Sequence, residues 1–157
     1  MPERPLRHFA RRMIERRLRK LLRCAKPALL TGRDDDLHAT RIAVKRLRYN
    51  LEFFAGILGE GYQPALEQLA LVQERLGTIA DADAFARFYD DLTDHFSDGD
   101  PRFAGIRARR EAALLERERA IESLRALWTG AGQTPYPELL AASISSALGS
   151  LSPKDDS

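Results

Sequence analysis

The sequence predicts an all-α fold, an antiparallel bundle of about five long helices followed by one short C-terminal helix. Two observations lead to this prediction. Residues that favour helices (Ala, Leu, Arg and Glu) dominate the 157-residue chain, and no segment alternates apolar and polar residues as β-strands do. The connections between the helical segments are only a few residues long, so consecutive helices should be antiparallel neighbours.

The first two helices are delimited by proline, aspartate and glycine. The first is expected over residues 4–25, because Pro27 disfavours helical conformation in the residue before it. The second should start after the acidic run 34–36, which supplies N-caps, and end near Leu58, since Gly59 follows.

The third and fourth helices are separated by a glycine. Pro64 suits the first turn of a helix over residues 63–76, and Gly77 lies just past its expected end. A further helix is expected over residues 81–94.

The fifth and sixth helices carry the same start signal. Asp100 is a capping residue followed by Pro101, and the helix should continue to about Trp128. Residues 134–135, Thr-Pro, repeat that signal for a short helix ending near Leu148.

A regular apolar seam runs along the fifth helix. Its members recur at an average step of about 3.5 residues, as in bundles: Phe103, Ile106, Ala113, Leu124 and Trp128. Arg110 and Arg117 fall on the same seam. Either they extend their charged ends to solvent at its edge, or they point into a shared basic cavity.

One domain with a single core suits a chain of this length. We expect it to span residues 1–149, and we expect residues 150–157, SLSPKDDS, to be disordered. Cys24 is the only cysteine, which excludes an internal disulfide and a cysteine-based zinc site. No apolar run approaches the length of a transmembrane span, so no membrane partner is expected and the cytoplasm is the expected location.

Charge is distributed very unevenly. The formal net charge of the chain is +2, yet residues 1–50 hold 15 Lys and Arg against 5 Asp and Glu, a net +10. The remainder, residues 51–157, carries a net −8. This asymmetry predicts an anionic partner for the first third of the chain.

The second helix carries a basic stripe, formed by His38, Arg41, Lys45 and Arg48. At about 100° per residue these side chains fall in one arc spanning about 80°, and the stripe is about 15 Å long. Apolar residues flank it on both sides, one arc around Leu47 and another containing Ile42, Tyr49 and Phe53. Because both apolar arcs favour burial, the stripe should line a groove whose length suits a linear polyanion.

A second basic stripe lies on the first helix, formed by Arg12, Arg16, Arg19 and Arg23. Glu15 is the only acidic residue within 4–25, so these arginines lack partners one turn away. They are either an ordinary solvated face or part of the same anion site. The sequence does not decide whether the two stripes meet.

No catalytic, metal or cofactor site is expected. A single histidine in the first turn of a helix, such as His38, more often forms a hydrogen bond or packs than catalyses. No second histidine or cysteine lies at ligand spacing from it. The chain contains no phosphate-binding loop, nucleophile elbow or zinc motif.

Two segments resemble one known family. Residues 37–53, LHATRIAVKRLRYNLEF, resemble the signature helix of the CHAD family, the conserved histidine α-helical domain. Residues 73–81, QERLGTIAD, are similar to the family's downstream Gln-Asp-x-Leu-Gly-x-x-Asn-Asp pattern, with Glu74 and Ala80 as departures. The Arg-rich first helix and Trp128 also fit, so the resemblance covers about residues 4–130.

The resemblance implies an all-helical domain that binds inorganic polyphosphate through basic side chains lining a central cavity. It assigns that role to His38, Arg41, Lys45 and Arg48, and on weaker grounds to the stripe of the first helix. Family members usually contain two copies of the helical unit, whereas this chain holds one, resembling the second. A homodimer would rebuild the cavity; otherwise the chain is a fragment with half a site.

Three functions remain in competition. The leading expectation is non-catalytic polyphosphate binding, with association with polyphosphate granules as its corollary. Nucleic acid would attract the same arginines, but Tyr49 and Phe53 are expected to be buried and so unable to stack on bases. A purely structural bundle would leave every basic stripe solvated.

Overall fold

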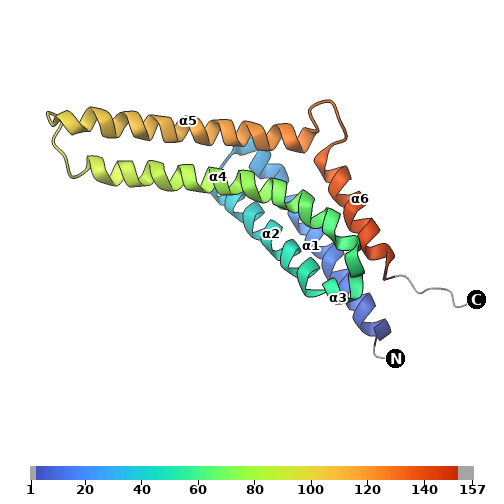
Figure 1. The fold of residues 1–157 in the computed structure, drawn as a ribbon. Helices are drawn as coiled ribbons and strands as arrows, with labels where there is room; N and C mark the ends of the chain where they lie inside the picture. Colours follow the sequence, from blue (N-terminus) through green and yellow to red (C-terminus); the bar gives the residue numbers. More distant parts are fainter. Residues whose placement is uncertain (1–2, 152–157) are drawn as a thin grey trace, which may run out of the picture.

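The computed structural model describes residues 3–151, and those residues contain helices and no strands. The all-α bundle is therefore confirmed (Figure 1). The elements in order are α1 (Glu3–Thr31), α2 (Asp34–Phe53), α3 (Ala55–Leu58), the 3₁₀ helix η1 (Gly59–Tyr62), α4 (Gln63–Thr93), α5 (Pro101–Thr129) and α6 (Tyr136–Gly149).

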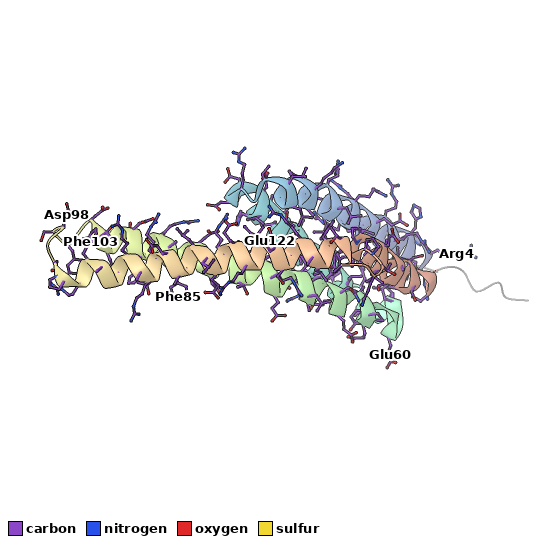
Figure 2. The ribbon with its side chains drawn as sticks, turned by 90° about the horizontal axis from the view of Figure 1, so that it is seen from above. Arg4, Glu60, Phe85, Asp98, Phe103 and Glu122 are labelled. Atoms are coloured by element: carbon purple, nitrogen blue, oxygen red, sulfur yellow. The ribbon has the colours of Figure 1, made fainter. Side chains whose placement is uncertain are left out.

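Two helical hairpins form the fold. In one, α1 packs along α2; in the other, α4 packs along α5. The hairpins meet where α4 contacts α2, and α6 folds back to cover η1 and the start of α4. The far part of the α4–α5 hairpin projects beyond the α1–α2 pair as a two-helix arm (Figure 1), with Asp98 and Phe103 at its tip (Figure 2).

The core lies where the two hairpins cross. It is built from aliphatic side chains of all the long helices, including Ile14, Leu21, Val44, Leu47, Leu69, Leu76, Ile121, Leu124 and Leu140. Along the arm the seam of α5 is less covered, and Phe103 and Ile106 are only half-buried. The reason is geometric, since two helices alone cannot enclose a side chain as fully as four.

The first helix is longer than the sequence predicts. Pro27 was expected to end it, but α1 continues to Thr31 with Pro27 inside. The proline is exposed, so the carbonyl that loses its helical hydrogen bond can be solvated. Thr31 then donates a hydrogen bond from Oγ1 to the carbonyl of Pro27, at 2.9 Å.

The middle of the chain also departs from the prediction. The second helix ends at Phe53 rather than near Leu58, and α3 follows after a break at Phe54. The two helices expected over 63–76 and 81–94 form one helix, α4. Gly77 lies inside it, and the cost of an interior glycine, about 1 kcal/mol, is offset by the burial of its neighbours Leu76 and Ile79.

The start of α5 agrees with the prediction. Asp100 is its N-cap and accepts a hydrogen bond from the backbone N–H of Arg102, with Pro101 in the first turn. The Arg102 side chain also donates to this carboxylate. These hydrogen bonds lower the pKa of Asp100 to about 2.

Arg117 joins the two hairpins. Its guanidinium donates to Asp83 of α4 at 2.6 Å, and to Asp34 and the carbonyl of Gly32 at 2.7 Å each. Burial alone would lower the pKa of Arg117, but the hydrogen bonds to the two carboxylates outweigh it and raise the pKa. Neither seam arginine points into a shared basic cavity. Arg117 is ion-paired at the junction, whereas the charged end of Arg110 pairs with Asp90 at the partly exposed edge of the seam.

The last helix is anchored by an aromatic residue. Tyr136 is buried, its ring lies 5.1 Å from that of Trp128, and its hydroxyl donates to the carbonyl of Gln68. Burial raises the pKa of Tyr136. Within the expected tail, Ser150 donates to the carbonyl of Leu58 and Leu151 is buried, while residues 152–157 lie outside the described residues.

Replacing Arg117 by Met should destabilise the fold. Removing one partner of a buried ion pair leaves the other charge uncompensated, and Asp83, whose side chain is 15% exposed, would be stranded. We expect the free energy of unfolding in urea to fall by about 3 kcal/mol. The matched control is Arg119→Met, at an exposed position two residues on, and an equal loss there would contradict the role of the ion pairs.

The cap of α5 should weaken in acid. Because folding depresses the pKa of Asp100, its contribution to stability is complete above the unfolded pKa, about 3.9, and declines as the pH falls through that value toward the folded pKa of about 2. An NMR titration of the Asp100 carboxyl carbon should give a midpoint near 2. Arg102→Gln should move that midpoint upward; an unchanged midpoint would mean that Arg102 does not lower this pKa.

Candidate functional site: a cationic groove between α2 and α4

The basic stripe of α2 lies along the side of the helix that adjoins α4. Arg41, Lys45 and Arg48 are half-buried, and His38 is exposed. The adjoining side of α2 packs into the core through buried Val44 and other aliphatic residues. This amphipathic arrangement follows from the helical spacing, and the burial of the arc around Leu47 agrees with the sequence analysis.

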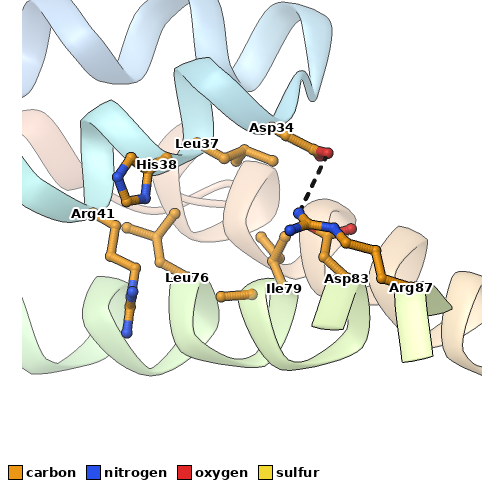
Figure 3. Close-up of a pocket in the computed structure, with 9 residues that line it drawn as sticks. Asp34, Leu37, His38, Arg41, Leu76, Ile79, Asp83 and Arg87 are labelled. Carbon is orange, nitrogen blue, oxygen red and sulfur yellow. Dashed lines mark ion pairs between the residues drawn. The ribbon is translucent and has the colours of Figure 1, made fainter. Parts of the chain in front are cut away.

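A pocket of ≈ 210 Å³ lies between the first turns of α2 and the middle of α4 (Figure 3). From α2 it is lined by Asp34, Leu37, His38 and Arg41, and from α4 by Leu76, Ile79, Ala80, Asp83 and Arg87. Its base is apolar, since Leu37, Leu76 and Ile79 are buried core residues. The charged groups therefore surround an apolar base, a setting in which Coulombic attraction is stronger than in open water.

Charges of both signs line this pocket, and some of them are ion-paired while others are not. Asp83 is engaged by Arg117, and Arg87 approaches Asp34 at 3.9 Å across an exposed gap (Figure 3). Within residues 3–151, neither His38 nor Arg41 forms a side-chain hydrogen bond or ion pair. The pocket thus offers an imidazole and a guanidinium that have no partner in the described part of the chain.

Further along the stripe the two remaining cations differ. Lys45 has no hydrogen bond or ion pair among the described residues. Arg48 donates to the amide oxygen of Gln73 at 2.9 Å, and its Nε lies 3.3 Å from a carboxylate oxygen of Glu52. Gln73 therefore holds the Arg48 side chain toward α4, although Arg48 does not itself line the pocket.

The second apolar arc of α2 corrects the sequence analysis. Tyr49 is 54% exposed and Phe53 is 80% exposed, whereas both were expected to be buried. No helix within residues 3–151 covers Tyr49 and Phe53, whereas Ile42, which belongs to the same arc, is half-buried beside α1. The stripe therefore borders one buried arc and one exposed aromatic arc, and the Arg48 guanidinium lies 5.3 Å from the centre of the Tyr49 ring.

The stripe of α1 does not join the stripe of α2 in a common pocket. Its four arginines are exposed, and none of them lines the pocket between α2 and α4. They also form no side-chain hydrogen bond or ion pair among the described residues. This set consists of Arg12, Arg16, Arg19 and Arg23.

The sequence analysis missed Arg87 as a pocket residue. Arg87 follows Leu76, Ala80 and Asp83 at steps of four, three and four, which places all of them on one face of α4. That spacing would have identified it had α4 been treated as continuous. Because a helix break was expected at Gly77, residues before and after it could not be assigned to a common helical face.

Two searches of the described residues gave negative results. Within residues 3–151, no group of three or more His, Cys, Asp or Glu is placed to hold a metal ion. In the same range, no helix combines the length and the apolar character needed to cross a membrane.

The fold and the site together define an all-α bundle with a cation-rich groove. A family model described as the CHAD domain matches residues 1–90, which is more than half of the chain, and the chain therefore belongs to the CHAD-domain family. CHAD domains are generally binding domains, associated with polyphosphate and triphosphate. No curated protein and no solved structure matches the chain.

Proposed function

We propose that this protein binds inorganic polyphosphate, without catalysis, through the cationic groove of α2. The observation that supports this most directly concerns Arg41 and Lys45, two half-buried cations one turn apart that have no hydrogen-bond or ion-pair partner within residues 3–151. Partly desolvated charges without partners are costly, and a polyanion running along α2 would compensate them.

The groove has a direction that suits a chain of phosphates. His38 and Arg41 lie at the pocket, Lys45 lies one turn on, and Arg48 is held toward α4 by Gln73. Phosphate groups spaced along the helix could meet these side chains in turn. The arginines of α1 face solvent and would add long-range attraction rather than direct contacts in the groove.

Nucleic acid remains the second candidate, and one observation favours it. The exposed ring of Tyr49 lies beside the stripe, and single-stranded nucleic acids bind where aromatic rings and cations alternate. Competition between polyphosphate and single-stranded DNA or RNA of matched charge separates the two. Polyphosphate should displace the nucleic acid at the lower concentration; the reverse order would favour nucleic acid as the ligand.

Replacing Arg41, Lys45 and Arg48 together by Gln should weaken polyphosphate binding. Each phosphate contact that is lost means that about one counterion fewer is released on binding. The slope of log K against log salt should therefore become less steep by about 2 to 3. Titration calorimetry at several salt concentrations measures both effects, and circular dichroism checks that the helices remain.

The matched control removes the same number of positive charges from a different surface. Arg107, Arg109 and Arg119 are exposed on α5, so their triple replacement by Gln should leave the affinity and the salt slope nearly unchanged. Equal losses in both triple variants would show that only net charge matters. A separate replacement of the four α1 arginines would measure their long-range contribution.

We also propose that two copies of the chain form a homodimer through an exposed apolar patch. Leu6 and Phe9 of α1 and Phe53 of α2 are exposed side chains, and both phenyl rings pack edge-on against buried Phe54. A two-fold axis would place this patch against its own copy and double the number of basic stripes available to one polyanion.

Sedimentation equilibrium with and without polyphosphate tests the dimer. We expect a monomer–dimer equilibrium that polyphosphate shifts toward the dimer by mass action. Phe53→Ser should weaken dimerisation at little cost to the monomer, because Phe53 is 80% exposed. A monomer at every accessible concentration, with and without polyphosphate, would contradict the proposal.

A further inference from the structure

A second pocket, separate from the groove beside α4, lies between α1 and α2. Its volume is ≈ 210 Å³. Arg17 and Lys20 of α1 and Arg46 of α2 supply its charges, and Cys24, Ile42 and Ala43 supply apolar wall. No member of the basic stripes of α1 or α2 lines it.

The helical spacing accounts for the pocket. Arg17, Lys20 and Cys24 are separated by three and four residues, so they lie on one face of α1. Ile42 and Arg46 are one turn apart on α2. The small side chain of Ala43 leaves the space between the helices open.

The charge in this pocket is uncompensated. No carboxylate lines it, in contrast to the pocket beside α4, where Asp34 and Asp83 are present. Within residues 3–151, none of the three cations of the pocket forms a side-chain hydrogen bond or ion pair. The Nε of Arg17 is buried and has no hydrogen-bond acceptor among the described residues. A buried donor of a charged group without an acceptor in the protein favours a partner from outside the chain, and the partner that fits three cations is an anion.

The walls restrict the kind of anion. Inorganic phosphates have no apolar part and would leave Ile42 and Ala43 in contact only with polar groups. An organic phosphate places its phosphate on the cations and its carbon skeleton on the apolar wall, which adds hydrophobic stabilisation.

We propose that the pocket between α1 and α2 binds a small phosphate monoester with an apolar body. The phosphate accepts hydrogen bonds from Arg17, Lys20 and Arg46, and the apolar body contacts Ile42, Ala43 and Cys24. This site is independent of polyphosphate binding, because it shares no residue with the stripe of α2.

Phenyl phosphate is a suitable probe, with inorganic phosphate as the comparison of similar charge. NMR titration of the intact 157-residue protein should give an affinity for phenyl phosphate about tenfold higher than for inorganic phosphate, from burial of part of the ring. Arg17→Gln and Arg46→Gln should each weaken phenyl phosphate about tenfold, the loss of one charge-assisted hydrogen bond. Lys20→Gln, at an exposed position, serves in place of Arg17→Gln if that variant loses helicity.

Matched variants separate the two parts of the ligand. Ile42→Ser should weaken phenyl phosphate while leaving inorganic phosphate unchanged. Arg109→Gln, which removes one exposed cation on α5, should change neither affinity. If Arg109→Gln weakens binding as much as Arg17→Gln and Arg46→Gln do, the anion binds by net charge alone and the proposal is wrong.

Cys24 reports occupancy of the pocket directly. It is the only cysteine of the chain and is half-buried in the pocket wall, so alkylation by iodoacetamide modifies one known position. Saturating phenyl phosphate should slow this alkylation severalfold, and Arg46→Gln should remove the protection at the same ligand concentration. Alkylation at an unchanged rate, or equal affinity for inorganic phosphate, would overturn the proposal.

Discussion

The three-way contact of Arg117 positions the rest of the structure. This guanidinium, carried by α5, binds Asp83 of α4 and, at the start of α2, Asp34 and the carbonyl of Gly32. A cation with a side chain only 15% exposed requires such partners, because its lost hydration must be replaced. Since the contact joins one hairpin to the first turn of the other, it sets the distance between α2 and α4. Asp34 and Asp83, which Arg117 binds, also line the pocket that contains His38.

The same contact helps to explain why Arg41 and Lys45 of α2 have no partners within residues 3–151. Asp83 and Asp34 direct their oxygens to Arg117, and Arg87 competes for Asp34 from α4. The carboxylates nearest the groove are therefore committed to holding the hairpins together. Arg41 and Lys45 remain available, and the net −8 of residues 51–157 does not neutralise them. Structural ion pairing and the proposed anion binding thus depend on separate sets of charges within one surface.

Much of the fold could be predicted from local chemistry, and the exceptions have physical causes. Asp100 and Pro101 mark a helix start correctly, because capping depends only on neighbouring residues. Pro27 and Gly77 mark helix ends incorrectly. An interior proline costs a helix about 3 kcal/mol and an interior glycine about 1 kcal/mol, and the packing of the flanking side chains outweighs these costs. The error at Gly77 also hid Arg87, whose place in the pocket depends on α4 being continuous.

The sequence by itself determined the all-α class, the basic stripe on one face of α2 and the family to which that helix belongs. These depend on the 3.6-residue period and on residue identity, which are properties of the chain alone. Only the tertiary structure decided what covers each face. Tyr49 and Phe53 are exposed because no helix within residues 3–151 packs on their side of α2, and Arg17 and Arg46 share a pocket because α1 and α2 meet there. Periodicity assigns a residue to a face of its helix, but burial is set by the neighbouring helices, which a one-dimensional pattern does not specify.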